Sequence, residues 1–219
     1  MTTYQSPISQ APAVYNLLIA NVVAYLATML LDTLHIYGLF ALFPVGSYFF
    51  EWWQPLTYMF MHGDFTHLFF NMFALWMFGR GLEQDMGTKR FLIYYFVCGI
   101  GAALTQLAIA EIDIMHLADH PEALVYYMNT PTLGASGAVF GLLLAFGMLH
   151  PNAIIMLLIP PIPLKAKWFV LIYGLLELGF IIFQKQTGVA HFAHLGGMFW
   201  GWLLLMWWQH RDRRRNYYY

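Results

Sequence analysis

Two side chains in the sequence have the chemistry of a nucleophile and its base. Ser136 lies in the run Gly134-Ala135-Ser136-Gly137 at the start of an apolar stretch, and His194 begins another such stretch. A serine hydroxyl is a weak nucleophile until a base removes its proton, and a neutral imidazole is the side chain best suited to this near neutral pH. The pair therefore predicts nucleophilic catalysis by serine.

Other polar side chains could complete such a site. His67 and Asn71 are four residues apart, so they share one helix face. Together with the free N–H groups at the start of the helix that carries Ser136, they could stabilise an oxyanion. A carboxylate within a membrane-spanning helix is a functional candidate by default, and Glu177 is such a residue if its apolar segment spans a membrane. No other carboxylate is expected at the membrane depth of His194. Unless Glu177 reaches across from its own helix, we therefore expect a Ser–His dyad, and we leave Glu177 out of the catalytic set.

The elements that position these residues are predicted to be membrane-spanning helices. Of the 219 residues, 60% are hydrophobic and only 10% are charged, and the charges fall in clusters between long apolar stretches. We therefore expect one all-α membrane domain with no separate soluble domain. The net charge of −1 gives no support for nucleic-acid binding. The single cysteine, Cys98, cannot form an intrachain disulfide and is expected to be a small core residue.

Six apolar runs have about the length of a spanning helix. They are Val14 to Asp32, Leu56 to Phe78, Phe91 to Ala110, Thr132 to Leu149, Trp168 to Phe183, and Val189 to Trp208. This pattern divides the chain into a short N-terminal tail (1–13), a six-helix domain (14–208) and a basic C-terminal tail (209–219).

The distribution of basic residues predicts the orientation of the spans. An even number of spans places both termini on one side of the membrane. Nine of the ten lysines and arginines then fall on that side, and only Lys185 falls on the other. Because basic residues accumulate in cytoplasmic segments, both termini are expected to be cytoplasmic, in the inner (plasma) membrane of a bacterium. The first outer loop, about residues 33–55, contains Trp52 and Trp53, which are typical of an interfacial segment.

In this topology Ser136 and His194 lie at matching depth, roughly 5–10 Å below the outer boundary at 1.5 Å per residue. Each is followed by two glycines at four-residue spacing, which allow two membrane helices to approach closely. These are Gly137 with Gly141, and Gly197 with Gly201.

Four segments, taken in order, resemble the rhomboid family of intramembrane serine proteases. They are Trp52-Trp53-Gln54; Met61 to Asn71, leading to Gly79; Gly134 to Gly141; and Ala193 to Gly197, leading to Gly201. The six predicted spans agree with the basic bacterial-type form of that family. The resemblance implies that Ser136 is the nucleophile, that His194 is the general base, and that His67 and Asn71 help to stabilise the oxyanion.

The resemblance also implies supporting roles. Phe140 would pack against the ring of His194, His62 would support the site from the loop side, and Gly134 would permit a close backbone at the serine. His191, one turn before His194, could bind water at the cavity mouth. One position departs from the family pattern, because Gln54 stands where an arginine is common and brings hydrogen-bond donors without charge.

The implied reaction is hydrolysis of a peptide bond in or near the outer end of a transmembrane helix of another membrane protein in the lipid bilayer. The paired backbone of such a helix must unwind before attack, so helix-weakening and small residues are expected near the cut. No metal or other cofactor is expected.

Two other classes of function remain open from the sequence. His62, His67, His191 and His194 could converge on a metal or haem, although no His-Glu-x-x-His motif or accompanying cysteine pair is present. Alternatively, the same fold could bind and escort membrane helices without cleaving them, in which case Ser136 would be dispensable.

Overall fold

The protein is mostly helical. The computed structural model describes residues 10–31, 33–156, 161–183 and 190–217. Residues 1–9 of the predicted N-terminal tail, Lys185, and the predicted span ends Asp32 and Val189 lie outside the described residues.

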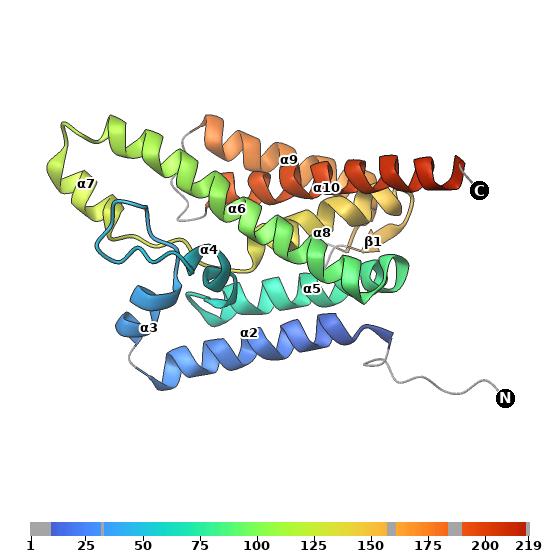
Figure 1. Ribbon diagram of the computed structural model, residues 1–219, viewed down its shortest axis with the longest axis horizontal. Coiled ribbons are helices and arrows are strands. Elements are labelled where there is room, and N and C mark those ends of the chain that lie inside the picture. Colours follow the sequence, from blue (N-terminus) through green and yellow to red (C-terminus); the bar gives the residue numbers. More distant parts are fainter. Residues whose placement is uncertain (1–9, 32, 157–160, 184–189, 218–219) are drawn as a thin grey trace.

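The six longest helices among the described residues run along a common direction (Figure 1). They are α2 (Pro12–Leu30), α5 (Phe65–Met86), α6 (Thr88–His116), α8 (Ser136–Leu149), α9 (Ala166–Ile182) and α10 (His191–Tyr217). Within the described residues, α2 and α6 have both the length and the hydropathy of a membrane span, and α8 is apolar but shorter. Each of the six predicted spans overlaps one of these helices.

Two predicted helix starts are wrong for local reasons. The second span was expected from Leu56, but α5 begins only at Phe65, where the Asp64 side chain caps the helix by accepting from the His67 N–H at 2.8 Å. The residues before this cap fold instead into α4 (Gln54–Thr57) and the 3-10 helix η1 (Tyr58–Phe60). The fourth span was expected from Thr132, but Thr132 pairs with Leu42 through two backbone hydrogen bonds, and α8 begins at Ser136.

The segments that connect the longer helices contain short helices and strands that were not predicted from the sequence. Two short helices, α3 (Thr33–Phe40) and α7 (Pro121–Met128), lie at the end of the bundle opposite the chain termini (Figure 1). The segment between α8 and α9 contains β1 (Ile154–Met156) and β2 (Pro163–Lys165), which pair antiparallel with Ile155 opposite Leu164. The helix α10 continues to Tyr217, through most of the predicted basic tail.

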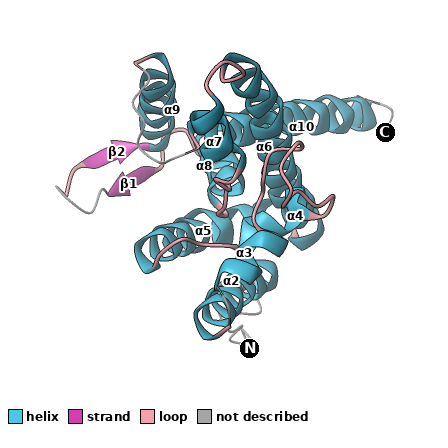
Figure 2. Cartoon of the chain, turned by 90° about the vertical axis from the view of Figure 1, so that its left-hand side faces the viewer, coloured by secondary structure: helices cyan, strands magenta, loops and turns pink. Residues whose placement is uncertain are grey.

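The core lies where α6, α8 and α10 pack against one another, and α2 packs mainly on α5. Viewed along the helices, α9 and the β-ribbon stand at the edge of the bundle (Figure 2). A buried carboxylate joins α5 to α2, because Glu83 accepts the N–H groups of Ala13 at 3.0 Å and Val14 at 2.9 Å. It also accepts the Thr88 hydroxyl at 2.7 Å. This carboxylate satisfies the free donors at the start of α2.

Gln54 holds the loop between α3 and α4 by three hydrogen bonds. Its side chain is fully buried. Its amide nitrogen donates to the carbonyls of Gly38 at 3.1 Å and Phe49 at 2.7 Å, and its oxygen accepts the Phe43 N–H at 3.2 Å. The glutamine therefore fixes the loop without a charge.

Replacing Gln54 with alanine should destabilise the protein. The change leaves a buried N–H and two carbonyls without these partners, which costs about 2 to 4 kcal/mol of unfolding free energy. Thermal unfolding in detergent measures the loss, and Gln84→Ala, the same substitution at an exposed position, serves as the control. Equal melting temperatures for the two variants would contradict this role of Gln54.

Candidate active site

The site is built on a close crossing of α8 and α10. A Cβ atom added to Gly197 would overlap the carbonyl oxygen of Gly137, and one added to Gly141 would stand 3.2 Å from the carbonyl oxygen of Gly197. The backbones of α8 and α10 are therefore near enough for a short side chain on one helix to reach the other. Gly201 packs against α6 instead, because a Cβ atom there would overlap the hydroxyl of Tyr94 and the sulfur of buried Cys98.

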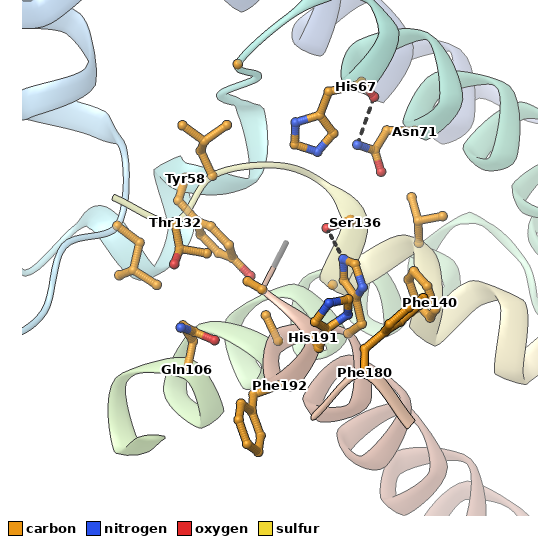
Figure 3. Close-up of a pocket in the computed structure, with 18 of the residues that line it drawn as sticks. Tyr58, His67, Asn71, Gln106, Thr132, Ser136, Phe140, Phe180, His191 and Phe192 are labelled. Carbon is orange, nitrogen blue, oxygen red and sulfur yellow. Dashed lines mark hydrogen bonds between the residues drawn. The ribbon is translucent and has the colours of Figure 1, made fainter. Parts of the chain in front are cut away.

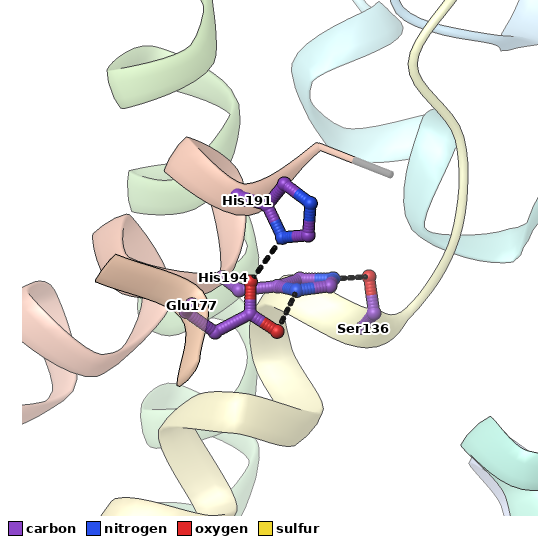
Figure 4. Close-up of polar contacts among 4 residues, drawn as sticks. All are labelled: Ser136, Glu177, His191 and His194. Atoms are coloured by element: carbon purple, nitrogen blue, oxygen red, sulfur yellow. Dashed lines mark hydrogen bonds and ion pairs between the residues drawn. The ribbon is translucent and has the colours of Figure 1, made fainter. Parts of the chain in front are cut away.

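Ser136 and His194 meet across this crossing. Ser136 is the first residue of α8, and its Oγ lies 2.8 Å from Nε2 of His194 near the start of α10 (Figure 4). The ring of Phe140, one turn further along α8, stacks on the His194 ring with centroids 4.1 Å apart and planes 9° apart. The stacking fixes the plane of the imidazole, so its Nε2 faces the hydroxyl.

A carboxylate from α9 reaches both histidines of α10. One oxygen of Glu177 lies 2.5 Å from Nδ1 of His191, and the other lies 3.1 Å from Nδ1 of His194 (Figure 4). The second contact is within ion-pair range but lacks the alignment of a hydrogen bond. Glu177 therefore does reach His194 from its own helix. The sequence predicted a dyad only if Glu177 did not reach this histidine.

His67, Asn71, Ser136 and His194 line one cavity. Figure 3 shows His67, Asn71 and Ser136 at this cavity. Gly134, two residues before the serine, has a φ of 123°, and its N–H donates to the Tyr58 carbonyl at 3.0 Å. A Cβ atom there would stand 2.7 Å from Nε2 of His67, so only glycine lets this ring approach the loop. The amide nitrogen of Asn71 donates to the His67 carbonyl at 3.0 Å.

The start of α8 adds backbone donors to this cavity. The N–H groups of the first turn of a helix have no intrahelical acceptor, and Ser136 and Gly137 belong to that turn. Both residues line the cavity with His67. The arrangement can present several hydrogen-bond donors to an oxygen held beside the serine.

His62 lies in the loop before α5, behind His67. It is fully buried, its ring meets that of His67 edge-on with centroids 5.1 Å apart, and its carbonyl accepts the Tyr37 hydroxyl at 2.7 Å. Burial lowers the pKa of His62 to about 4, with the neighbouring His67 acting in the same direction. Near neutral pH the His62 ring is therefore uncharged, and it packs against the ring of His67.

Among the described residues, Glu177, His191 and His194 form the one group with metal-binding geometry, since one ligand atom from each lies within 4.8 Å of the others. His62 and His67 are not part of it. The metal or haem site made of four histidines, which the sequence left open, is therefore not formed by these residues.

The sequence matches the Rhomboid domain family over residues 50–210, which includes every residue of the site described above. The chain belongs to the rhomboid family. Its residues lie in a helical bundle with two helices of membrane-spanning length and hydropathy, as expected of an integral membrane protein of this family.

Several curated rhomboids are similar over the same region. The mitochondrial rhomboid protein 1 of Saccharomyces cerevisiae is 32% identical over 65% of this chain and 38% of its own length. The rhomboid protease AarA of Providencia stuartii is 31% identical over 67% of this chain and 52% of its own. RHOMBOID-like protein 5 of Arabidopsis thaliana is 30% identical over 71% of this chain and 45% of its own. The chain thus spans roughly half the length of these relatives.

Alanine at Gly197 should disrupt this rhomboid, whereas alanine at Gly179 should not. The new methyl group at Gly197 would meet backbone of α8, which cannot move aside alone, so a loss of about 3 kcal/mol or more is expected. A Cβ at Gly179, within α9, has no neighbouring atom within 4 Å, and alanine there favours the helix. Thermal unfolding of both variants tests this, and a Gly197→Ala protein as stable as the wild type would refute the crossing.

Acidification should destabilise this rhomboid through His62. Its pKa is near 6.5 when unfolded and about 4 when folded, so between these values only the unfolded chain binds the proton. Stability from the neutral ring is complete above pH 6.5 and falls as the pH drops toward 4, by about 2 kcal/mol between pH 7 and pH 5. His62→Gln should show a smaller fall in melting temperature over this interval. An identical fall in both proteins would show that His62 does not contribute.

Proposed function

We propose that the protein is an intramembrane serine endopeptidase that uses Ser136 and His194 as a dyad. The observation that carries the proposal is the 2.8 Å contact between Ser136 Oγ and His194 Nε2 at a cavity inside an apolar helical bundle. The similarity to a relative named as a rhomboid protease supports the same reaction.

In this reaction the Ser136 hydroxyl donates its proton to Nε2 of His194 while Oγ attacks the carbonyl carbon of the scissile peptide. The oxyanion that forms accepts hydrogen bonds from the N–H groups at the start of α8, assisted by His67 and Asn71. Protonated His194 then gives its proton to the leaving amine, and an acyl group remains on Ser136. Water, deprotonated by His194, hydrolyses this ester and restores the serine.

The bundle would cross the membrane six times, with residues 14–208 as the protease domain and residues 1–13 and 209–219 as short cytoplasmic tails. The start of α2 and the end of α10 lie at the same end of the bundle (Figure 1). At that end Arg90 pairs with Asp212 at 2.9 Å, and Arg211 lies over the Trp207 ring, as basic residues do at a cytoplasmic interface. The active site would open toward the outer side of a bacterial inner membrane.

The substrates would be transmembrane segments of other proteins in the bilayer, cut at or near their outer ends. Their backbone amides are paired within the helix, so the segment must unwind into the cavity before Ser136 can attack. The cavity is lined by apolar side chains beside the few polar groups of the site, which suits an unwound apolar segment. No nucleic acid, metal or other cofactor enters this reaction.

A fluorophosphonate probe should label the purified protein in detergent. Ser136→Ala should abolish labelling, and His194→Ala should slow it to a small residual rate. The probe reacts rapidly only with a serine whose proton is removed by a base, so fast labelling requires both residues. In-gel fluorescence after a fixed time measures the product. Ser47→Ala, which removes the hydroxyl of another serine, should label like the wild type.

The same experiment separates the competing classes of function. A folded wild-type protein that does not label would favour a binding protein on the rhomboid fold. If EDTA abolished labelling and zinc restored it, a metal at Glu177, His191 and His194 would be required and the dyad account would be wrong. The proposal expects EDTA to have no effect.

A further inference from the structure

Glu177 has no part in the dyad reaction, yet it is one of two buried carboxylates in the part of the chain that the structure describes. It is 7% exposed, and it comes from α9, a different helix from those that carry Ser136 and His194. Its two oxygens divide between two histidines of α10, at 2.5 Å from His191 and 3.1 Å from His194. Burying the charge of a carboxylate in apolar surroundings costs free energy, and the contacts with the two histidines offset this cost.

The atoms of three helices form a chain in the order needed for base catalysis. Ser136 Oγ is followed by Nε2 of His194, then by Nδ1 of the same ring, then by the Glu177 carboxylate (Figure 4). An imidazole that accepts a proton at Nε2 must carry its own proton at Nδ1. The carboxylate beside Nδ1 favours that tautomer, and its charge stabilises the imidazolium formed when the serine proton arrives.

We propose that Glu177 is a positioning residue that completes a Ser136–His194–Glu177 triad, with His191 holding the carboxylate. This inference rests on the proposed function, because it assigns a role within the same reaction. The proton stays on His194 and does not pass to the carboxylate. The serine proton moves to Nε2, later leaves with the amine, and the charge of Glu177 is unchanged throughout.

His191 is suited to hold the carboxylate because it is fixed independently of His194. Its ring stacks on Phe180 of α9, with centroids 5.0 Å apart and planes 25° apart. It stands nearly perpendicular to the His194 ring, at 87° with centroids 6.3 Å apart. Phe140 covers the His194 ring from α8. Both imidazoles are thus held by aromatic neighbours, and the carboxylate lies between two fixed nitrogens.

The test measures the kinetics of fluorophosphonate labelling for the full chain in detergent. Glu177→Gln keeps the size of the side chain and removes its charge, so the maximal labelling rate should fall about 10- to 100-fold. The half-saturating probe concentration should change by less than about twofold, because the carboxylate does not touch the probe. Glu177→Asp keeps the charge one methylene further back and should give an intermediate rate.

A double variant separates positioning from a purely structural role. If Glu177 acts through His194, then Glu177→Gln should cause no further loss of the residual labelling rate in a His194→Ala background. A structural role would lower that rate again by a similar factor. Glu83→Gln is the matched control, since it alters a buried carboxylate that joins α2 to α5 far from the chain of atoms. It should lower the melting temperature while the labelling rate of the folded protein stays the same.

The outcomes distinguish this inference from the proposed function. If the folded wild type fails to label, or labelling survives Ser136→Ala, the proposed function falls and the triad falls with it. If labelling requires Ser136 and His194 but Glu177→Gln reacts as fast as the wild type, only the triad is overturned. Additive losses in the double variant also overturn it.

Discussion

The close approach of α8 and α10 is the constraint on which the site depends. Serine has a short side chain, so its oxygen reaches an imidazole on another helix only if the two backbones nearly touch. Gly137 and Gly197 allow this, because any side chain at position 197 would overlap backbone of the facing helix. The helices are close-packed at this point, so they cannot slide or separate to make room for a larger residue. The crossing therefore fixes the distance between the Ser136 hydroxyl and the His194 ring.

The second determinant of the site is how polar groups are satisfied inside an apolar bundle. Gln54 ties the loop near the cavity through neutral hydrogen bonds, and Glu83 satisfies the first N–H groups of α2. The partners of Glu177 are the imidazoles of His191 and His194, whereas those of Glu83 include backbone N–H groups. Each of these three buried side chains has its own set of partners, and only the partners of Glu177 include the proposed base.

Much of the helical plan could be predicted from the sequence, because long apolar runs require spanning helices wherever water is absent. The starts of α5 and α8 could not, since they depend on a cap at Asp64 and on the pairing of Thr132 with Leu42, which hydropathy does not register. Ser136, His194, His67 and Asn71 could be proposed from residue type and spacing, and the structure places all four at one cavity. Glu177 was left out of the catalytic set because a protonated carboxyl group that only pairs with a neighbouring helix was an equally good interpretation. The rotation of its helix relative to α10, which decides between the two, is not encoded in either span alone. The position of Glu177 six residues before the end of the fifth predicted span gives a depth of roughly 9 Å, close to that of His194, and was the available signal.

The central claim is that Ser136 cuts peptide bonds within the membrane. The most direct test reconstitutes the protein in liposomes with a set of membrane-spanning peptides that carry small residues in their outer third, and maps the products by mass spectrometry. The account predicts cleavage in that outer third by the wild type and none by Ser136→Ala. Cleavage in the cytoplasmic half, or cleavage that persists in Ser136→Ala, would contradict it.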